Sequence, residues 1–149
     1  MKVLMVCLGN ICRSPMAEGI LRRKIEEQGL QWEVDSAGTG NWHVGESPHQ
    51  DSIREASKHH IDITGQRARQ LEKSDFEYFD LILVMDDQNL NNALQLAGAH
   101  QKQKVKKLLS FHPDDTLDNV PDPYFEGGFD AVFTMIEEAC SVLVETYKS

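Results

Sequence analysis

A potential nucleophile lies close to a fixed positive charge near the beginning of the chain. Cys7 follows the apolar run Val3–Val6, and Arg13 follows in a Cys-x5-Arg spacing, directly before Ser14-Pro15. A thiol is a good nucleophile only as the thiolate, and the pKa of a free cysteine is about 8.5. Backbone N–H groups of a tight loop, the positive end of the next helix and the Arg13 guanidinium would all favour the ionised sulfur.

The same groups predict a binding site for a tetrahedral oxyanion. A helix start offers free N–H groups to an anion, and an arginine can hold two oxygens at once. The other residues expected around the anion are Leu8, Gly9, Asn10, Ile11, Cys12 and Ser14. The chemistry implied is transfer of a phosphoryl group to Cys7, followed by hydrolysis of the phosphocysteine.

Other interpretations of this segment are weaker. A cysteine and an arginine alone would favour a buried structural thiol, but the strand, the loop length and the helix start make the whole segment more specific. A nucleotide-binding P-loop is excluded because the segment contains no Gly-Lys-Ser/Thr. Cys7 and Cys12 have no second cysteine pair, and the six histidines show no ligand spacing, so we expect no metal or other cofactor.

Apolar runs and amphipathic segments alternate along the chain. Ser14-Pro15 and Ser47-Pro48 each combine an N-cap residue with a proline that begins a helix. The expected strands are Met1–Val6, Trp32–Ser36, Asp80–Met85 and Val105–Leu109. The expected helices run from Pro15 to about Gly29, from Pro48 to about His59, within Leu71–Phe79, over Asp86–Ala97 and from Phe129 to Val144. This alternation predicts a single α/β domain over residues 1–149, with a parallel sheet between two layers of helices.

Ligands of such sheets bind at the carboxyl ends of the strands. Cys7 and Ser36 both lie at strand ends, and an acidic loop from His112 to Tyr124 follows the last strand. Asp122 stands between two prolines in this loop, where it is a candidate proton donor. The acidic residues of the loop would otherwise be interpreted as a solvated surface. In the first helix, Glu18 is expected on a face other than the apolar one.

Composition narrows the classes of partner. The net charge is −9 with no basic stripe, which argues against nucleic acid as a partner. No apolar run is long enough to span a bilayer, so membrane insertion is not expected. Three cysteines and the absence of a signal-peptide pattern favour a reducing, cytoplasmic location, although export without a signal peptide stays open. We expect a monomer.

The segment CLGNICRSP at the N-terminus resembles the low-molecular-weight protein-tyrosine phosphatases. Further motifs follow in the order and spacing of that family, so the resemblance extends over nearly the whole chain. These motifs are Asp35-Ser36-Ala37-Gly38, Trp42 with Val44-Gly45, Ala68-Arg69-Gln70, Met85-Asp86 and Asp122-Pro123-Tyr124. The resemblance implies a four-stranded parallel sheet and metal-independent hydrolysis of phosphotyrosine in proteins, with inorganic phosphate and other oxyanions as inhibitors.

The resemblance also implies a role for each site residue. Cys7 is the nucleophile, Arg13 clamps the phosphate and Asp122 is the general acid. Ser14 donates a hydrogen bond to the sulfur of Cys7, whereas Asn10 and Ser36 hold the loop in shape. Trp42 and Tyr124 line the substrate cleft. Cys12 is a redox partner that can form a reversible disulfide with Cys7.

Two departures and two rival functions accompany the resemblance. Gln66 stands where animal members often have a loop-supporting histidine, and Phe125 replaces a second tyrosine. The thioredoxin-linked arsenate reductases have a similar cysteine loop, but they need further cysteines that residues 72–110 lack. A phosphopeptide-binding module without activity is disfavoured because Cys7, Arg13 and Asp122 are all present.

Overall fold

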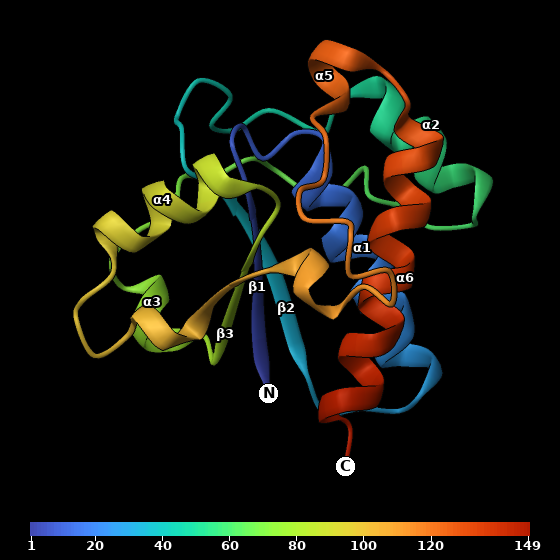
Figure 1. Ribbon diagram of the computed structural model, residues 1–149. Coiled ribbons are helices and arrows are strands. Elements are labelled where there is room, and N and C mark those ends of the chain that lie inside the picture. Colours follow the sequence, from blue (N-terminus) through green and yellow to red (C-terminus); the bar gives the residue numbers. More distant parts are fainter.

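A parallel four-stranded sheet forms the centre of the molecule. The computed structural model describes residues 1–149, and its strands are β1 (Lys2–Cys7), β2 (Glu33–Gly38), β3 (Leu81–Val84) and β4 (Val105–Lys107). The strand order is β2-β1-β3-β4, and all neighbouring strands run parallel. The strands therefore place their carboxyl ends at one edge of the sheet, at the top in Figure 1.

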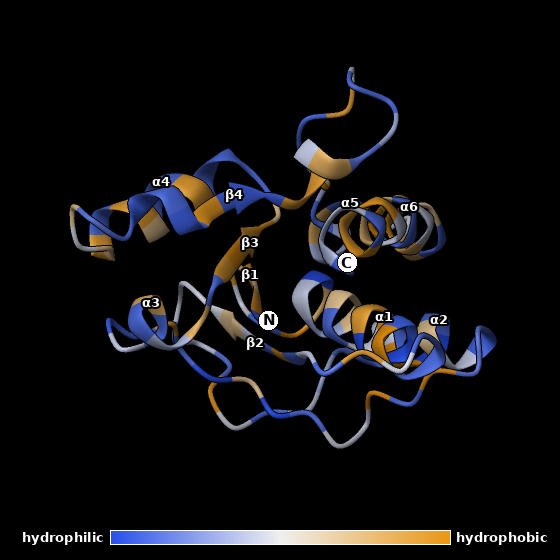
Figure 2. Cartoon of the chain, turned by 90° about the horizontal axis from the view of Figure 1, so that it is seen from below, coloured by the Kyte–Doolittle hydropathy of each residue, from blue (hydrophilic) through white to orange (hydrophobic).

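Helices cover both faces of this sheet. The α-helices are α1 (Arg13–Glu27), α2 (Gln50–Lys58), α3 (Asp75–Tyr78), α4 (Asp87–Leu96), α5 (Pro123–Glu126) and α6 (Phe129–Tyr147). Two short 3₁₀ helices, η1 (Lys102–Lys104) and η2 (Leu108–Phe111), flank β4. Figure 2 shows α3 and α4 on one side of the sheet and α1, α2 and α6 on the other. The predicted α/β sandwich with four parallel strands is confirmed.

The side chains of β1 alternate between the two cores. Val3 and Met5 pack into the larger cluster beneath α1 and α6, whereas Leu4 and Val6 pack into the smaller cluster beneath α3 and α4. All four side chains are fully buried. A strand buried on both faces has no polar face in its sequence, which explains the continuous apolar run before Cys7.

The prediction for the start of each of two helices was wrong in detail. Helix α1 begins at Arg13 rather than Pro15, and its Ser14 makes no cap hydrogen bond. Helix α2 begins at Gln50, where the ring Nδ1 of His49 accepts the N–H of Asp51 at 3.0 Å. In each case the serine-proline pair lies near the helix start, but the serine does not cap it, and Ser14 has another partner.

The remaining elements agree with the predicted ones to within a few residues, and α5 is a short additional helix in the acidic loop. Helix α1 ends at Glu27, and Gly29, the predicted stop, follows two residues later with a φ of +62°. None of the helices combines the length and the apolar composition that a membrane span requires.

Candidate active site

The loop between β1 and α1 brings two polar groups to the sulfur of Cys7. The N–H of Asn10 donates to Sγ at 3.3 Å, and the hydroxyl of Ser14 lies 3.0 Å from the same atom. Both groups can stabilise a negative charge on the sulfur. The first turn of α1 contains Ser14, so the positive end of the helix dipole also faces Cys7.

Asn10 holds the loop in a backbone conformation that is rare for residues with a side chain. Its φ is +57°, in the left-handed region, which costs on the order of 1 kcal/mol for a residue other than glycine. Its amide nitrogen donates to Ser14 Oγ at 2.7 Å and to Ser36 Oγ at 3.0 Å, and its amide oxygen accepts the N–H of Arg69 at 3.0 Å. These three hydrogen bonds, two of them buried and one partly buried, contribute about 1 kcal/mol each and together outweigh that cost.

The end of β2 supports the loop through backbone contact as well. Gly38 is the last residue of β2, and a Cβ placed there would lie 2.8 Å from the carbonyl oxygen of Leu8 and 3.1 Å from the nitrogen of Asn10. Neither backbone atom can move away easily, because Leu8 O accepts the N–H of Gly40 at 2.9 Å. The close approach therefore requires glycine at position 38.

Arg13 is 2% exposed, and its guanidinium is held from one side. Its Nη1 donates to Asp86 Oδ2 at 2.7 Å and to the carbonyl oxygen of Val120 at 2.8 Å, which uses both hydrogens of that nitrogen. Nη2 makes only a 3.5 Å contact with Asp122 Oδ2. The Nε and Nη2 donors therefore remain available to two oxygens of one anion.

The charges around Arg13 keep it protonated. Burial by itself would lower the pKa of the guanidinium, but the negative charges of Cys7, Asp86 and Asp122 raise the pKa above its usual value. Arg13 therefore stays protonated and offers a positive group to an arriving phosphate.

Asp122 reaches the site from the far end of the chain. It caps α5, where its Oδ1 accepts the N–H of Tyr124 at 3.1 Å, and its Oδ2 points toward Arg13. The side chain is partly exposed. Its position at the rim of the site, with solvent access, suits a group that exchanges protons with substrate and water.

A cleft of about 330 Å³ opens above the loop. Its floor contains Cys7, Leu8, Gly9, Ile11, Cys12 and Arg13, and its walls are Trp42, His43, Asp122, Tyr124 and Phe125. Trp42 is 68% exposed and Phe125 is 73% exposed, so the rim is apolar and open to solvent. The cleft has room for a phenyl phosphate whose phosphate group lies at the floor.

Cys12 lines the same cleft as Cys7 and is a free thiol, as is Cys7. Burial raises the pKa of Cys12 to about 12, and the nearby Cys7 and Asp122 add to the effect. Cys12 therefore keeps its proton at neutral pH.

The sequence analysis missed the contacts of two carboxylates, and it left open whether Gln66 supports the loop. Asp86 was expected at the start of a helix and as part of the Met85-Asp86 motif; it caps α4, and it also pairs with Arg13. Its position after β3, at the same edge of the sheet as Cys7, is the signal that pointed to the site. Glu18, expected away from the apolar face of the first helix, is buried. Gln66 donates to the carbonyl oxygen of Pro15 at 3.0 Å and makes no hydrogen bond with Asn10.

Comparisons with known proteins agree with this architecture. The family model "Low molecular weight phosphotyrosine protein phosphatase" matches residues 2–149. The chain belongs to this family. It has the family's α/β fold, and it is a protein-tyrosine phosphatase, a hydrolase that acts on phosphoproteins.

Three relatives illustrate the similarity. The low molecular weight protein-tyrosine-phosphatase YfkJ of Bacillus subtilis is 41% identical over 95% of this chain and 92% of its own length, and its crystal structure has a TM-score of 0.96 and covers 99% of this chain and 94% of that chain. A protein tyrosine phosphatase from Entamoeba histolytica, with Hepes in its active site, is 35% identical with a TM-score of 0.94 over 99% of this chain and 97% of that chain. DARP, described as a Drosophila arginine phosphatase, is 36% identical with a TM-score of 0.94 over 100% of this chain and 99% of that chain.

Proposed function

We propose that this phosphatase hydrolyses phosphotyrosine through a phosphocysteine on Cys7, with Arg13 as the phosphate clamp and Asp122 as the general acid and base. The observation that supports the proposal best is the environment of the Cys7 sulfur. Sγ has two hydrogen-bond partners behind it and a cleft in front of it, and that cleft also contains the free donors of Arg13. The three reacting groups come from one chain, so the proposed unit is a monomer.

In the first step the Cys7 thiolate attacks the phosphorus atom, and the bond from phosphorus to the phenolic oxygen breaks. The loop N–H groups of residues 8–12 and the Nε and Nη2 donors of Arg13 hold the three equatorial oxygens, where charge accumulates. Asp122 gives its proton to the leaving phenolate, which makes tyrosine a neutral product. Its carboxyl lies at the rim of the cleft, where the ester oxygen of a bound phosphotyrosine would be.

In the second step a water molecule attacks the phosphocysteine. Asp122, now ionised, accepts a proton from this water, and the bond from sulfur to phosphorus breaks. The leaving group is the Cys7 thiolate, whose charge the Ser14 hydroxyl and the Asn10 N–H stabilise from behind. The released phosphate is the expected competitive inhibitor, together with vanadate and other oxyanions.

The cleft favours an aryl group over a guanidinium group next to the phosphate. Trp42 and Tyr124 provide aromatic walls, and Ile11 adds an apolar surface near the floor. A phosphoarginine would bring N–H donors that need acceptors, and the only carboxylate in the cleft, Asp122, already faces Arg13. Because DARP is described as an arginine phosphatase, phosphoarginine is the informative comparison substrate.

We also propose that Cys12 protects Cys7 against irreversible oxidation. Peroxide converts the Cys7 thiolate into a sulfenic acid and is reduced to water. Cys12 then attacks this sulfur, a disulfide forms and the hydroxyl leaves as a second water. The oxidised Cys7 has lost its negative charge, which removes one of the influences that raise the pKa of Cys12. Thiols reduce the disulfide and restore the enzyme.

The test is the Cys7→Ser variant with phosphotyrosine, phosphoarginine and p-nitrophenyl phosphate. We expect the variant to lose turnover but to bind a phosphotyrosine peptide, and wild-type turnover to resist chelators and to be inhibited by vanadate. A Cys140→Ser variant is the matched control, since Cys140 lies on the buried face of α6, in the larger core. Turnover by Cys7→Ser at the wild-type rate would overturn the proposed nucleophile, and preferential hydrolysis of phosphoarginine would overturn the proposed substrate.

A further inference from the structure

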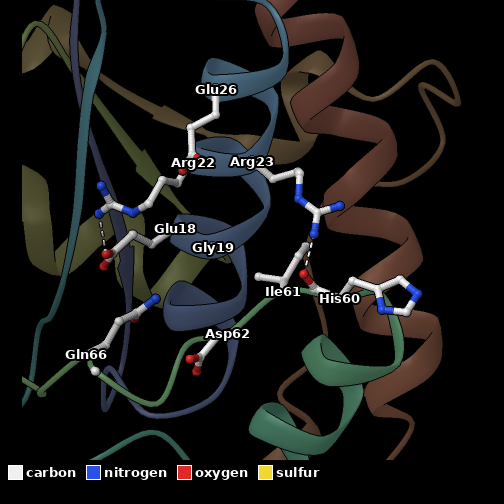
Figure 3. A pocket seen from close by; sticks show the side chains of 10 residues that line it. Glu18, Gly19, Arg22, Arg23, Glu26, His60, Ile61, Asp62 and Gln66 are labelled. Atoms are coloured by element: carbon white, nitrogen blue, oxygen red, sulfur yellow. Dashed lines mark hydrogen bonds and ion pairs between the residues drawn. The ribbon is translucent and has the colours of Figure 1, made fainter.

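A buried carboxylate stands directly behind the loop that holds Cys7. Glu18 lies in the second turn of α1 and is only 6% exposed. Its Oε1 accepts the hydroxyl hydrogen of Ser36 at 2.7 Å, and its Oε2 accepts Nη2 of Arg22 at 2.8 Å. Figure 3 shows Glu18 and Arg22 joined at one side of a polar hollow, with Gln66 apart from them. A buried charge of this kind requires an explanation, because removing a carboxylate from water is costly.

Glu18 is one end of a chain of hydrogen bonds that reaches the sulfur. From Glu18 the chain passes through Ser36 to the amide nitrogen of Asn10, from there to the hydroxyl of Ser14 and finally to Cys7 Sγ. The successive distances are 2.7, 3.0, 2.7 and 3.0 Å. Every link is within normal hydrogen-bond length.

Two groups that have only one possible role, an acceptor and a donor, set the direction of every hydrogen bond in this chain. An ionised carboxylate can only accept, so Ser36 must direct its hydrogen to Glu18 and offer a lone pair to Asn10. The backbone N–H of Arg69 can only donate, so it fixes the amide oxygen of Asn10 on its own side. Both N–H groups of that amide therefore point to serine oxygens.

One consequence concerns Ser14. Its oxygen accepts from Asn10, which leaves its own hydrogen free to point at the Cys7 sulfur. Without Glu18, the hydroxyl of Ser36 has no acceptor on its far side and can turn its hydrogen toward Asn10, where it would oppose the amide N–H. Asn10 would then lose a bond that keeps its strained φ, and the Ser14 hydrogen would lose its fixed direction.

We propose that Glu18 is a positioning residue for the reaction, which acts through Ser36 and Asn10 to keep the Ser14 hydroxyl donating to the Cys7 sulfur. The inference rests on the proposed role of Cys7 as nucleophile. In this proposal Glu18 and its partner Arg22 support the hydrogen-bond chain. Gln66 does not, because it donates to the carbonyl oxygen of Pro15 instead.

Arg22 fits this assignment. Its Nη2 donates to the carbonyl oxygen of Val34 at 3.1 Å as well as to Glu18, and Val34 lies two positions before Ser36 in β2. The arginine therefore fixes the carboxylate relative to the strand that carries Ser36. Burial raises the pKa of Glu18, while its hydrogen bonds to Ser36 and Arg22 act in the opposite direction and favour the charged form.

The experiment compares Glu18→Gln and Glu18→Ala with Glu26→Gln. Glu26 lies two turns further along α1, is exposed and borders the same hollow, so its variant makes the same chemical change away from the hydrogen-bond chain. For each protein we would measure kcat and KM for p-nitrophenyl phosphate and the pH dependence of Cys7 alkylation by iodoacetamide. A thermal melt would confirm that each variant is folded.

We expect Glu18→Ala to lower kcat about tenfold and to move the alkylation midpoint upward by about one pH unit, because a hydrogen bond to the thiolate is weakened. KM should change less than kcat. Glu18→Gln, whose amide oxygen can still accept from Ser36, should lose only about threefold in kcat. Glu26→Gln should match the wild type in every measurement.

Wild-type kcat and a wild-type alkylation profile in folded Glu18→Ala would overturn the inference. A loss of melting temperature without either change would show that Glu18 stabilises the fold only. Ser36→Ala breaks the chain but keeps the Glu18–Arg22 pair, and it should reproduce the effects of Glu18→Ala even if that variant does not fold. The alkylation profile does not depend on turnover, so it tests Glu18 even if Cys7 were not the nucleophile; loss of activity in Cys7→Ser tests that role separately.

Discussion

Asp86 offers a sharp test of how the fold prepares Arg13 for phosphate. One carboxylate oxygen accepts from Arg13 Nη1 at 2.7 Å, and the other accepts the N–H of Asn89 at 2.8 Å, which caps α4. An asparagine in this place has one acceptor and one donor, so it can satisfy Asn89 or Arg13 but not both. Asp86→Asn therefore removes one of two bonds, whereas Asp86→Ala removes both.

The expected magnitudes follow from burial. Arg13 is 2% exposed, and the Asp86 side chain is 23% exposed, so the pair is stronger than a surface ion pair but weaker than a fully enclosed one. Loss of one hydrogen bond to a charged group costs about 2 kcal/mol, and loss of a helix cap costs about 1 kcal/mol more. We expect the free energy of unfolding to fall by about 2 kcal/mol in Asp86→Asn and about 3 kcal/mol in Asp86→Ala.

The loss of catalytic efficiency in the Asp86 variants should be larger than their loss of stability alone would cause. Without Asp86, the guanidinium keeps only Val120 O on its Nη1 side and can rotate toward Asp122, away from the phosphate position. A clamp displaced by about 1 Å can cost up to a hundredfold in rate, so we expect kcat/KM for p-nitrophenyl phosphate to fall between about tenfold and a hundredfold. Phosphate inhibition should weaken in parallel.

The assays are urea unfolding and initial rates at several substrate concentrations. Asp87→Asn is the matched control, because Asp87 is the next residue, is exposed and pairs with Lys107 on the surface. It should leave both quantities nearly unchanged. If folded Asp86→Asn retains wild-type kcat/KM and phosphate affinity, then Arg13 is oriented by other contacts and the reasoning from its one-sided pairing is refuted.

Three further experiments address other groups of the molecule. Asp122→Asn should slow the first chemical step most for substrates with poor leaving groups, measured by burst kinetics over a series of aryl phosphates; an equal loss for all leaving groups would contradict the acid role. Cys12→Ser should lose more of its thiol-recoverable activity than the wild type after prolonged peroxide, and equal recovery would exclude a protective role. Burial raises the pKa of Cys140, as of Cys12, to about 12, so each thiol stays protonated in the folded chain while the unfolded chain loses that proton above about pH 9. The free energy of unfolding should therefore fall by roughly 1.4 kcal/mol per buried cysteine by pH 10. In urea unfolding, the fall for Cys140→Ala should be smaller than that of the wild type by the contribution of one cysteine. A fall as large as that of the wild type would contradict the prediction.

Much of the fold followed from local patterns. The apolar runs before Cys7 and before Met85 are buried strands, β1 and β3, and the final amphipathic segment is α6. These predictions succeeded because strands buried on both faces and helices with one apolar face leave distinct periodicities in the sequence. The glycine after α1 was also informative, since only the left-handed conformation ends that helix as observed.

The helix starts were less predictable because a serine can have several partners. Ser14 had the appearance of an N-cap, but its hydroxyl lies against Asn10 and Cys7. The N-cap pattern considers only the N–H groups of the following helix as hydrogen-bond partners of the serine. It does not include a thiol and an amide that come from the preceding loop, so the competing partners decided the outcome.

The order of the elements and the position of the candidate nucleophile could be predicted from the sequence alone. Cys7 and Arg13 flank one short loop, and the alternation of strands and helices requires that loop to lie at the carboxyl edge of a parallel sheet. These features depend on contacts within a few residues, or on a periodicity that any window of the chain contains.

The surroundings of Cys7 and Arg13 follow only from the folded chain. Glu18 and Asp86 look like ordinary surface and capping residues in the sequence, because the sequence does not show whether a carboxylate faces water or a buried partner. The packing of α1 against β2 turns Glu18 toward Ser36, and the adjacency of β1 and β3 brings Asp86 to Arg13. Hydrogen bonds between distant segments are satisfied only once the chain is folded, and they fix the directions in which the reactive groups point.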